Sequence, residues 1–304
     1  MKRSRLLLAV VLATAARMAA AAEDDARGPR DQPEAPQNVV YVTSFDSDAV
    51  LRFNVDTGAF LGVFVPPGSG GLNGPTGLTF GRDGHLYVAS FVLNNSVLKY
   101  HGHTGAFLGV FVTPGSGGLQ GPVDLRFGPD GDLYVVASYA GGVFRYNGQT
   151  GAFVSQFTAD PDGAEALAWR GGDLFVSSHM SDNVIRFDGE TGANMGPVTD
   201  GPLDWATGFA FGPDGNIYVA SFFDQTVVKF DGRTGEWMGK FADTGFGPQM
   251  IAFGPHGDLY VASYFGSAVD RYDGQTGEWV SSMWGNGLSG AMDIAFRRQP
   301  VTAP

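Results

Sequence analysis

The chain has 304 residues, a formal net charge of −12, no cysteine, 46 glycines and 13% aromatic residues. This composition excludes a disulfide-stapled fold and an intrinsically disordered chain, and it favours a fold held together by packing and tight turns. The acidic balance excludes nucleic acid as an expected partner, because phosphate binding needs clustered lysine and arginine.

The N-terminal segment differs in composition from the rest of the chain. Lys2, Arg3 and Arg5 precede an apolar stretch at 6–16, and small residues follow at 19–22. This order predicts a signal peptide at residues 1–22 and a mature chain that is secreted, extracellular or periplasmic. The apolar stretch is too short to span a membrane, so we expect no membrane span in the mature chain. Residues 23–37 are expected to form a flexible linker, and residues 297–304 a C-terminal tail.

Two marks repeat along the remaining chain. A strand of the type Tyr-Val-Ala-Ser begins at Tyr41, Tyr87, Tyr134, Phe175, Tyr218 and Tyr260. A Thr-Gly turn also recurs six times between Thr57 and Thr276. The spacing of about 41–47 residues is typical of propeller blades made of four strands. Each unit reads as strand, tight turn, strand, loop, strand, tight turn and strand, with Gly, Pro and Asp at the turns.

The two ends of the repeat region complete the count. Residues 290–296 match the first strand of a unit, but no second strand follows them, whereas residues 39–44 match second strands. We therefore predict an all-β fold, a single six-bladed β-propeller of four-stranded blades over residues 38–296. A blade shared between the two termini would close the ring and remove its open edges. We expect a monomer.

The repeated pattern Gly-Pro-Asp-Gly-x-Leu-Tyr-Val-Ala-Ser resembles NHL repeats and covers about residues 38–296. The pattern is more distantly similar to the gluconolactonase-like and streptogramin B lyase propellers. The resemblance implies the propeller fold. It does not identify an activity, because the repeated residues are turn formers and core residues, and one fold carries many functions.

Polar residues are predicted at one mouth of the central channel, where the loops entering first strands meet those leaving second strands. The more polar residue of each adjacent pair gives a ring of Thr76, Asp124, Glu165, Thr207, Gln249 and Asp293. The threonines and the glutamine would contact a ligand. The three carboxylates would hold a divalent cation (Ca²⁺, Mg²⁺ or Zn²⁺) or serve as an acid/base pair. Alternatively, they accept hydrogen bonds from loop N–H groups or line a hydrated channel.

A second ring is predicted directly after the second strands. It consists of Phe45, Phe91, Tyr139, His179, Phe222 and Tyr264. The aromatic residues would form a platform for sugars or peptides, or alternatively pack between neighbouring blades. His179 interrupts the aromatic pattern, and an imidazole near Glu165 would suit a general acid or base, the alternative being a structural role.

The two enzyme resemblances assign further roles to these residues. The lyase resemblance implies that His179 and Glu165 act with a divalent metal, although no local motif matches residue by residue. The gluconolactonase resemblance implies Glu, Asn and Asp ligands. Glu165, Asp124 and Asp293 are similar in type, but the asparagine is absent from the ring.

Three functions are compatible with this pattern. We expect a binding module that engages a protein, peptide or carbohydrate through the channel mouth and two Gly-rich loops, at 58–75 and 105–122. A metal-assisted lyase or lactonase at the mouth is the first alternative. A structural protein of the cell envelope is the second, and the Gly-rich segments would then be irregular surface loops.

Overall fold

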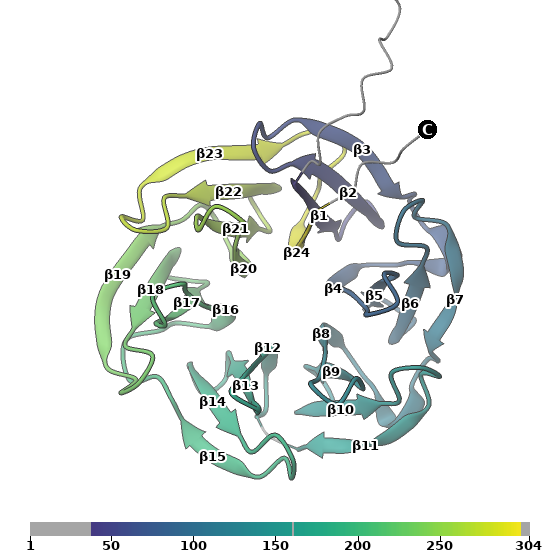
Figure 1. Cartoon of the computed structure of the whole chain (residues 1–304), viewed down its shortest axis with the longest axis horizontal. Coiled ribbons are helices and arrows are strands. Elements are labelled where there is room, and N and C mark those ends of the chain that lie inside the picture. The colour runs from purple at the N-terminus through teal and green to yellow at the C-terminus, as the bar shows by residue number, and fades with distance from the viewer. Residues whose placement is uncertain (1–37, 160, 299–304) are drawn as a thin grey trace, which may run out of the picture. The chain divides into compact units, whose positions relative to one another are not determined.

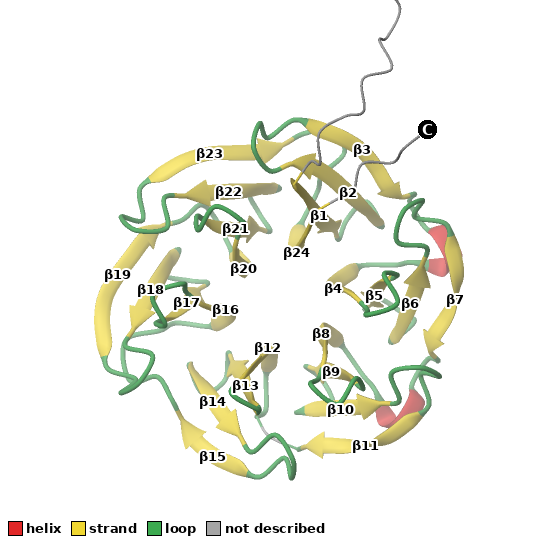
Figure 2. Ribbon diagram, viewed as in Figure 1, coloured by secondary structure: helices red, strands yellow, loops and turns green. Residues whose placement is uncertain are grey.

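The computed structural model describes residues 38–159 and 161–298, which form six antiparallel sheets of four strands arranged as a ring (Figures 1 and 2). From the inner strand outwards, blade 1 is β24 (Ala291–Arg298), β1 (Asn38–Ser44), β2 (Ala49–Asn54) and β3 (Phe60–Val65). Blade 2 is β4 (Pro75–Phe80), β5 (Leu86–Ser90), β6 (Ser96–Tyr100) and β7 (Phe107–Val112), and blade 3 is β8 (Pro122–Phe127), β9 (Leu133–Ala137), β10 (Val143–Tyr146) and β11 (Phe153–Thr158).

The remaining blades follow the same order. Blade 4 is β12 (Ala164–Arg170), β13 (Asp173–Ser178), β14 (Asn183–Phe187) and β15 (Asn194–Pro197). Blade 5 is β16 (Ala206–Phe211), β17 (Ile217–Ser221), β18 (Thr226–Phe230) and β19 (Trp237–Asp243). Blade 6 is β20 (Pro248–Phe253), β21 (Leu259–Ser263), β22 (Ala268–Tyr272) and β23 (Trp279–Trp284). The two segments predicted as Gly-rich loops, 58–75 and 105–122, are loops only in part, because β3 and β7 occupy them at 60–65 and 107–112. Two 3₁₀ turns, η1 (Ser69–Gly71) and η2 (Ser116–Gly118), lie in the parts that follow these strands.

The shared blade confirms the predicted closure of the ring. β24 pairs antiparallel with β1, placing Phe296 opposite Val40 and Ile294 opposite Val42. The pairing joins the two ends of the described chain in one sheet (Figure 1). β24 continues to Arg298, two residues beyond the predicted end at 296. The predicted signal peptide and linker, and the tail from 299 onwards, lie outside the described residues.

The core sits between consecutive blades. The second strands are buried on both faces, and each carries an aromatic ring. In blades 1, 2, 3 and 5 this ring meets one ring from the outer strand of its own blade and one from the next blade, whereas among the described residues Phe175 and Tyr260 meet only the ring from the next blade. The Tyr41 ring, for example, contacts Phe64 of its own blade and Phe80 of blade 2, both edge-on at 4.9 Å between centroids. The first strand of every blade places an aromatic ring against the second strand of the preceding blade. An edge-on ring contact therefore stabilises each of the six junctions between blades. None of the helices in the described part of the chain is long and apolar enough to cross a membrane.

Candidate functional site

A cavity of about 480 Å³ lies on the axis of the ring, because its lining residues come from all six blades. We call it the mouth cavity. Nine residues predicted from the sequence line it: Phe45, Thr76, Phe91, Tyr139, Glu165, His179, Phe222, Gln249 and Tyr264. Six others, not predicted, complete the lining: Val123, Ser138, Trp205, Phe223, Phe265 and Met292. The structure thus gathers most of the two predicted rings at one site.

Strand register separates the predicted polar ring into two layers. Thr76, Glu165 and Gln249 directly follow the first residue of their inner strands and line the mouth cavity. Asp124 and Asp293 stand one residue further along β8 and β24, and they do not line it. Successive side chains of a strand point to opposite sides, so one residue of offset changes the environment completely.

Thr207 shares the position of Thr76 but does not line the mouth cavity. Its hydroxyl donates to the carbonyl of Pro248 in the next blade, at 2.9 Å. The Thr76 hydroxyl makes the corresponding bond to the Pro122 carbonyl, at 2.8 Å. Both threonines are buried and link neighbouring inner strands, so their hydroxyls serve the fold.

The deeper layer is held together by Arg126 of β8. Its Nη1 lies 2.7 Å from Asp124 Oδ1 and 3.3 Å from Asp293 Oδ2. The carboxylates also accept backbone N–H groups from the next blade: Leu167 N donates to Asp124 at 2.9 Å, and Leu78 N donates to Asp293 at 2.9 Å. The carboxylates thus accept backbone hydrogen bonds, as in the alternative to a metal site, but the donors lie in the inner strands β12 and β4 and not in loops.

One cation faces two carboxylates in this deeper layer. Burial raises the pKa of the Asp124 carboxyl to about 6; Arg126 opposes the rise, and the negative charge of Asp293 adds to it. The predicted metal ligands Asp124, Glu165 and Asp293 are thus divided between two layers. Within residues 38–159 and 161–298, no three histidine or acidic side chains converge as metal ligands would. A bound divalent cation stays a prediction.

The aromatic ring needs one correction. The residue after each second strand donates its backbone N–H to the residue before the inner strand, as Phe91 does to Gly74 and Phe222 does to Trp205. In blade 3 this donor is Ser138, so the structural equivalent is Ser138 and not Tyr139. The sequence of β9 carries Val135 and Val136 before Ala137, which displaces an alignment based on Ala-Ser by one residue. Tyr139 still reaches the mouth cavity, with its ring 5.3 Å from that of Phe91.

His179 and Glu165 form a hydrogen-bonded pair in the mouth cavity. His179 Nδ1 lies 2.6 Å from Glu165 Oε1. Burial raises the pKa of Glu165, and the hydrogen bond from His179 opposes the rise. An ionised Glu165 can only accept a hydrogen bond, so Nδ1 of His179 then carries the donated proton. The pair therefore offers a ligand one carboxylate and one oriented imidazole.

Trp205 is the functional candidate that the sequence reasoning missed. Its ring stacks on His179 at 4.0 Å and 12° between planes. Its backbone has a φ of 65°, in the left-handed region. The equivalent position before the inner strand is glycine in the other five blades, also at positive φ: Gly74, Gly121, Gly163, Gly247 and Gly290. A bulky residue in this conformation costs about 1–2 kcal/mol, so the exception in the glycine pattern was the available sequence signal.

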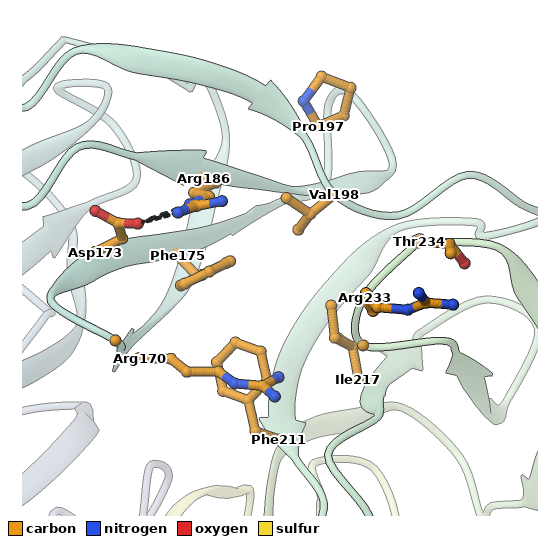
Figure 3. Close-up of a pocket in the computed structure, with 13 residues that line it drawn as sticks. Arg170, Asp173, Phe175, Arg186, Pro197, Val198, Phe211, Ile217, Arg233 and Thr234 are labelled. Carbon is orange, nitrogen blue, oxygen red and sulfur yellow. Dashed lines mark hydrogen bonds and ion pairs between the residues drawn. The ribbon is translucent and has the colours of Figure 1, made fainter.

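A separate cavity of about 530 Å³ lies between blades 4 and 5 (Figure 3). Val198 borders it at the position where Phe64, Phe111, Phe157 and Phe241 stand in other blades. The Asp173–Arg186 ion pair, at 2.8 Å from Nε, borders one side, and Arg170 lies over the Phe211 ring on another (Figure 3). The missing aromatic ring accounts for this hollow, so packing explains its origin.

Comparisons with known proteins identify the fold. No family model matches the chain, and no curated protein matches it. Among solved structures, a chain in "Crystal structure of Nidogen/Laminin Complex" is similar with a TM-score of 0.68 and 11% identity, covering 85% of this chain and 98% of that chain. At this identity the likeness concerns the fold alone, a six-bladed β-propeller, and membership of the NHL family stays a prediction.

Proposed function

We propose that the chain is a binding module whose mouth cavity receives a peptide or protein segment that presents an aromatic or aliphatic side chain beside a basic group. The observation that carries this proposal is the conformation of Trp205. Its side chain stacks on His179 at the cavity, in a backbone conformation that the other blades reserve for glycine. Strained residues persist where their side chains are needed, and they cluster at binding sites.

The chemistry of the lining supports this class of ligand. Phe45, Phe91, Phe222 and Tyr264 provide aromatic surface around the cavity, and such surfaces anchor apolar side chains of a partner. Glu165 is the one carboxylate among the lining residues, and no lysine or arginine accompanies it. With a formal charge of −12 on the chain, a basic segment is favoured both at long range and at the cavity.

The fold comparison and the N-terminal sequence are compatible with an exported recognition module. The similar propeller occurs in the structure of a nidogen/laminin complex, a complex between proteins. Residues 1–22 begin with charged residues, continue with an apolar stretch and end with small residues. This is the order expected of a signal peptide. We propose export with cleavage near Ala22. N-terminal sequencing of the native protein tests this, and a chain that retains Met1 in the cytosol would refute export.

A catalytic function is the second candidate, supported by the 2.6 Å contact between His179 and Glu165. A buried carboxylate that orients an imidazole is an arrangement suited to general acid/base chemistry. The lyase or lactonase alternative predicts turnover of lactone or ester substrates, with or without Ca²⁺, Mg²⁺ or Zn²⁺, and loss of that turnover in His179→Gln. Absence of turnover over a broad lactone panel with each ion would leave binding as the function.

The binding proposal is tested by selecting ligands from a random peptide library with the purified propeller. We expect the selected peptides to be enriched in an aromatic or aliphatic residue near lysine or arginine. Their affinity should fall at least tenfold in Trp205→Gly. Trp237→Ala provides the matched control, since Trp237 is an exposed tryptophan of the same blade that does not line the mouth cavity. No enrichment, or equal loss in both variants, would contradict the proposal.

A further inference from the structure

The outer part of blade 6 lacks the covering leucine that four of the other blades have. In blades 1, 2, 3 and 5, the loop that enters the blade places a leucine in the core cluster of that blade: Leu288, Leu72, Leu119 and Leu203. In blade 2 the cover also includes Ser69, whose carbonyl accepts the Tyr100 hydroxyl at 2.8 Å. The loop into blade 6, residues 244–247, has no leucine, and its Phe246 is exposed.

The uncovered strand carries a carboxylate in place of an apolar residue. The middle of the third strand is Leu51, Leu98, Phe144, Ile185 or Val228 in blades 1 to 5, and Asp270 in blade 6. Asp270 is only 9% exposed. Ser282 donates its hydroxyl to Asp270 Oδ1, and Trp279 Nε1 donates to Ser282 Oγ at 3.3 Å. A buried carboxylate costs stability, so this exception to the repeat indicates a role beyond folding.

A cavity of about 740 Å³ lies at this place, and we call it the blade 6 cavity. Asp270, Trp279 and Trp284 line it, together with the serines Ser263, Ser281 and Ser282. Trp279 is 61% exposed and Trp284 is 70% exposed. In blade 2, the residue equivalent to Trp279 is Phe107, whose ring packs closely on Gly70 of the covering loop.

We infer that the blade 6 cavity is a carbohydrate-binding site for a neutral saccharide. An indole ring offers an apolar surface to the C–H face of a sugar ring. A carboxylate accepts hydrogen bonds from sugar hydroxyls, and such charge-assisted bonds are the stronger kind. The serine hydroxyls supply further donors and acceptors to the same ligand. No lysine or arginine lines the cavity. An anionic sugar would therefore find no opposite charge there, and a neutral saccharide is favoured.

A quaternary ammonium ligand is the competing class, because tryptophans and a carboxylate also attract cations. The serines favour the saccharide, since their hydroxyls match the hydroxyls of a sugar and give a quaternary ammonium no hydrogen bond.

The test is binding of the propeller to an array of neutral oligosaccharides built from glucose, galactose, mannose, xylose and N-acetylglucosamine, with choline and trimethyllysine peptides on the same array. We expect binding to at least one oligosaccharide and at least a tenfold loss in both Asp270→Leu and Trp284→Ala. Asp270→Leu restores the apolar residue of other blades, and Trp284 is exposed, so both variants should fold. Trp237→Ala, at the equivalent of Trp279 in blade 5, should retain binding.

Several outcomes would overturn the inference. The first is that the wild type binds no saccharide. The second is that Asp270→Leu and Trp284→Ala bind saccharide as tightly as the wild type. The third is that the propeller binds only the quaternary ammonium probes. Trp205→Gly separates this site from the mouth cavity. Saccharide binding that survives in Trp205→Gly supports the blade 6 cavity, and saccharide binding lost in that variant alone places the ligand at the mouth and refutes the inference.

Discussion

The mouth layer and the deeper layer of the inner strands contain similar residue types yet have opposite roles. Glu165 lies at the cavity, bonded to one histidine, whereas Asp124 and Asp293 lie one residue further along their strands and bond Arg126 and backbone N–H groups. The deeper layer joins blades 1, 2, 3 and 4 through side chains. The comparison indicates that a polar residue in a propeller can be interpreted only after its layer is known.

Loss of Arg126 should have the largest effect. In Arg126→Met, two buried carboxylates would lose their common cation. Breaking such a buried ion pair costs about 3–5 kcal/mol in the free energy of unfolding. Urea denaturation measures this cost, with Arg82→Met as the control. Arg82 is an exposed arginine with a single carbonyl contact, and its replacement should change stability by less than about 0.5 kcal/mol. Equal effects of the two variants would contradict the structural role of the deeper layer.

The same change from carboxylate to amide in each layer gives a matched pair of smaller effects. Asp293→Asn should cost about 1.5–3 kcal/mol, because Asp293 accepts bonds from Leu78 N, Ile294 N and Arg126, and bonds to charged groups contribute about this much. Glu165→Gln should change the free energy of unfolding by less than about 1 kcal/mol, because it retains an acceptor for His179 and removes a buried charge. A loss of stability in Glu165→Gln that exceeds the loss in Asp293→Asn would contradict this difference between the two layers.

The pH dependence of stability should be weaker than the loss in Asp293→Asn, and it has a definite sign. Burial raises the pKa of Glu165, and it raises that of Asp124 to about 6. The folded chain therefore binds more protons than the unfolded chain between about pH 4 and 6, and stability falls as the pH rises through this window. We expect about 1–2 kcal/mol less stability at pH 7.5 than at pH 5. Burial would raise the pKa of Asp214, but hydrogen bonds from Lys229 and other groups hold it below its usual value. Its titration therefore changes the stability only below this pH window. Rising stability from pH 5 to 7.5 would contradict this account.

The fold was predictable because turn residues and buried strands repeat with one period. Six copies of the Tyr-Val-Ala-Ser strand indicated six blades, and the unmatched end segments indicated the shared blade. Most of the mouth lining was predictable too, since repeat positions become ring positions. The layer of Asp124 and Asp293 was not. Choosing the more polar residue of each adjacent pair ignores the alternation of a strand, and the structure shows that register decides which side chain faces the cavity.

Other features were missed for different reasons. Counting four residues from Tyr134 gives Ser138, as the same count from Tyr87 gives Phe91, whereas matching Ala-Ser gives Tyr139. The backbone hydrogen bond after β9 selects Ser138. Trp205 was not predicted because the candidate residues were polar exceptions among apolar positions, whereas Trp205 is an exception among glycines. Asp270 was not predicted because the candidate residues were chosen at the channel mouth, whereas Asp270 lies in the middle of β22. Exceptions to a repeat are informative whatever their polarity.

The central claim is that side chains at the mouth cavity serve ligand binding and not the stability of the fold. Its most direct test is the free energy of unfolding of Trp205→Gly, measured by urea denaturation. The glycine would adopt the φ of 65° without strain, as in the other five blades. Relief of about 1–2 kcal/mol of strain would offset the lost stacking on His179. We predict stability within about 1 kcal/mol of wild type. A loss of about 3 kcal/mol or more, typical of removing a large core side chain, would show that Trp205 serves the fold and would contradict the account.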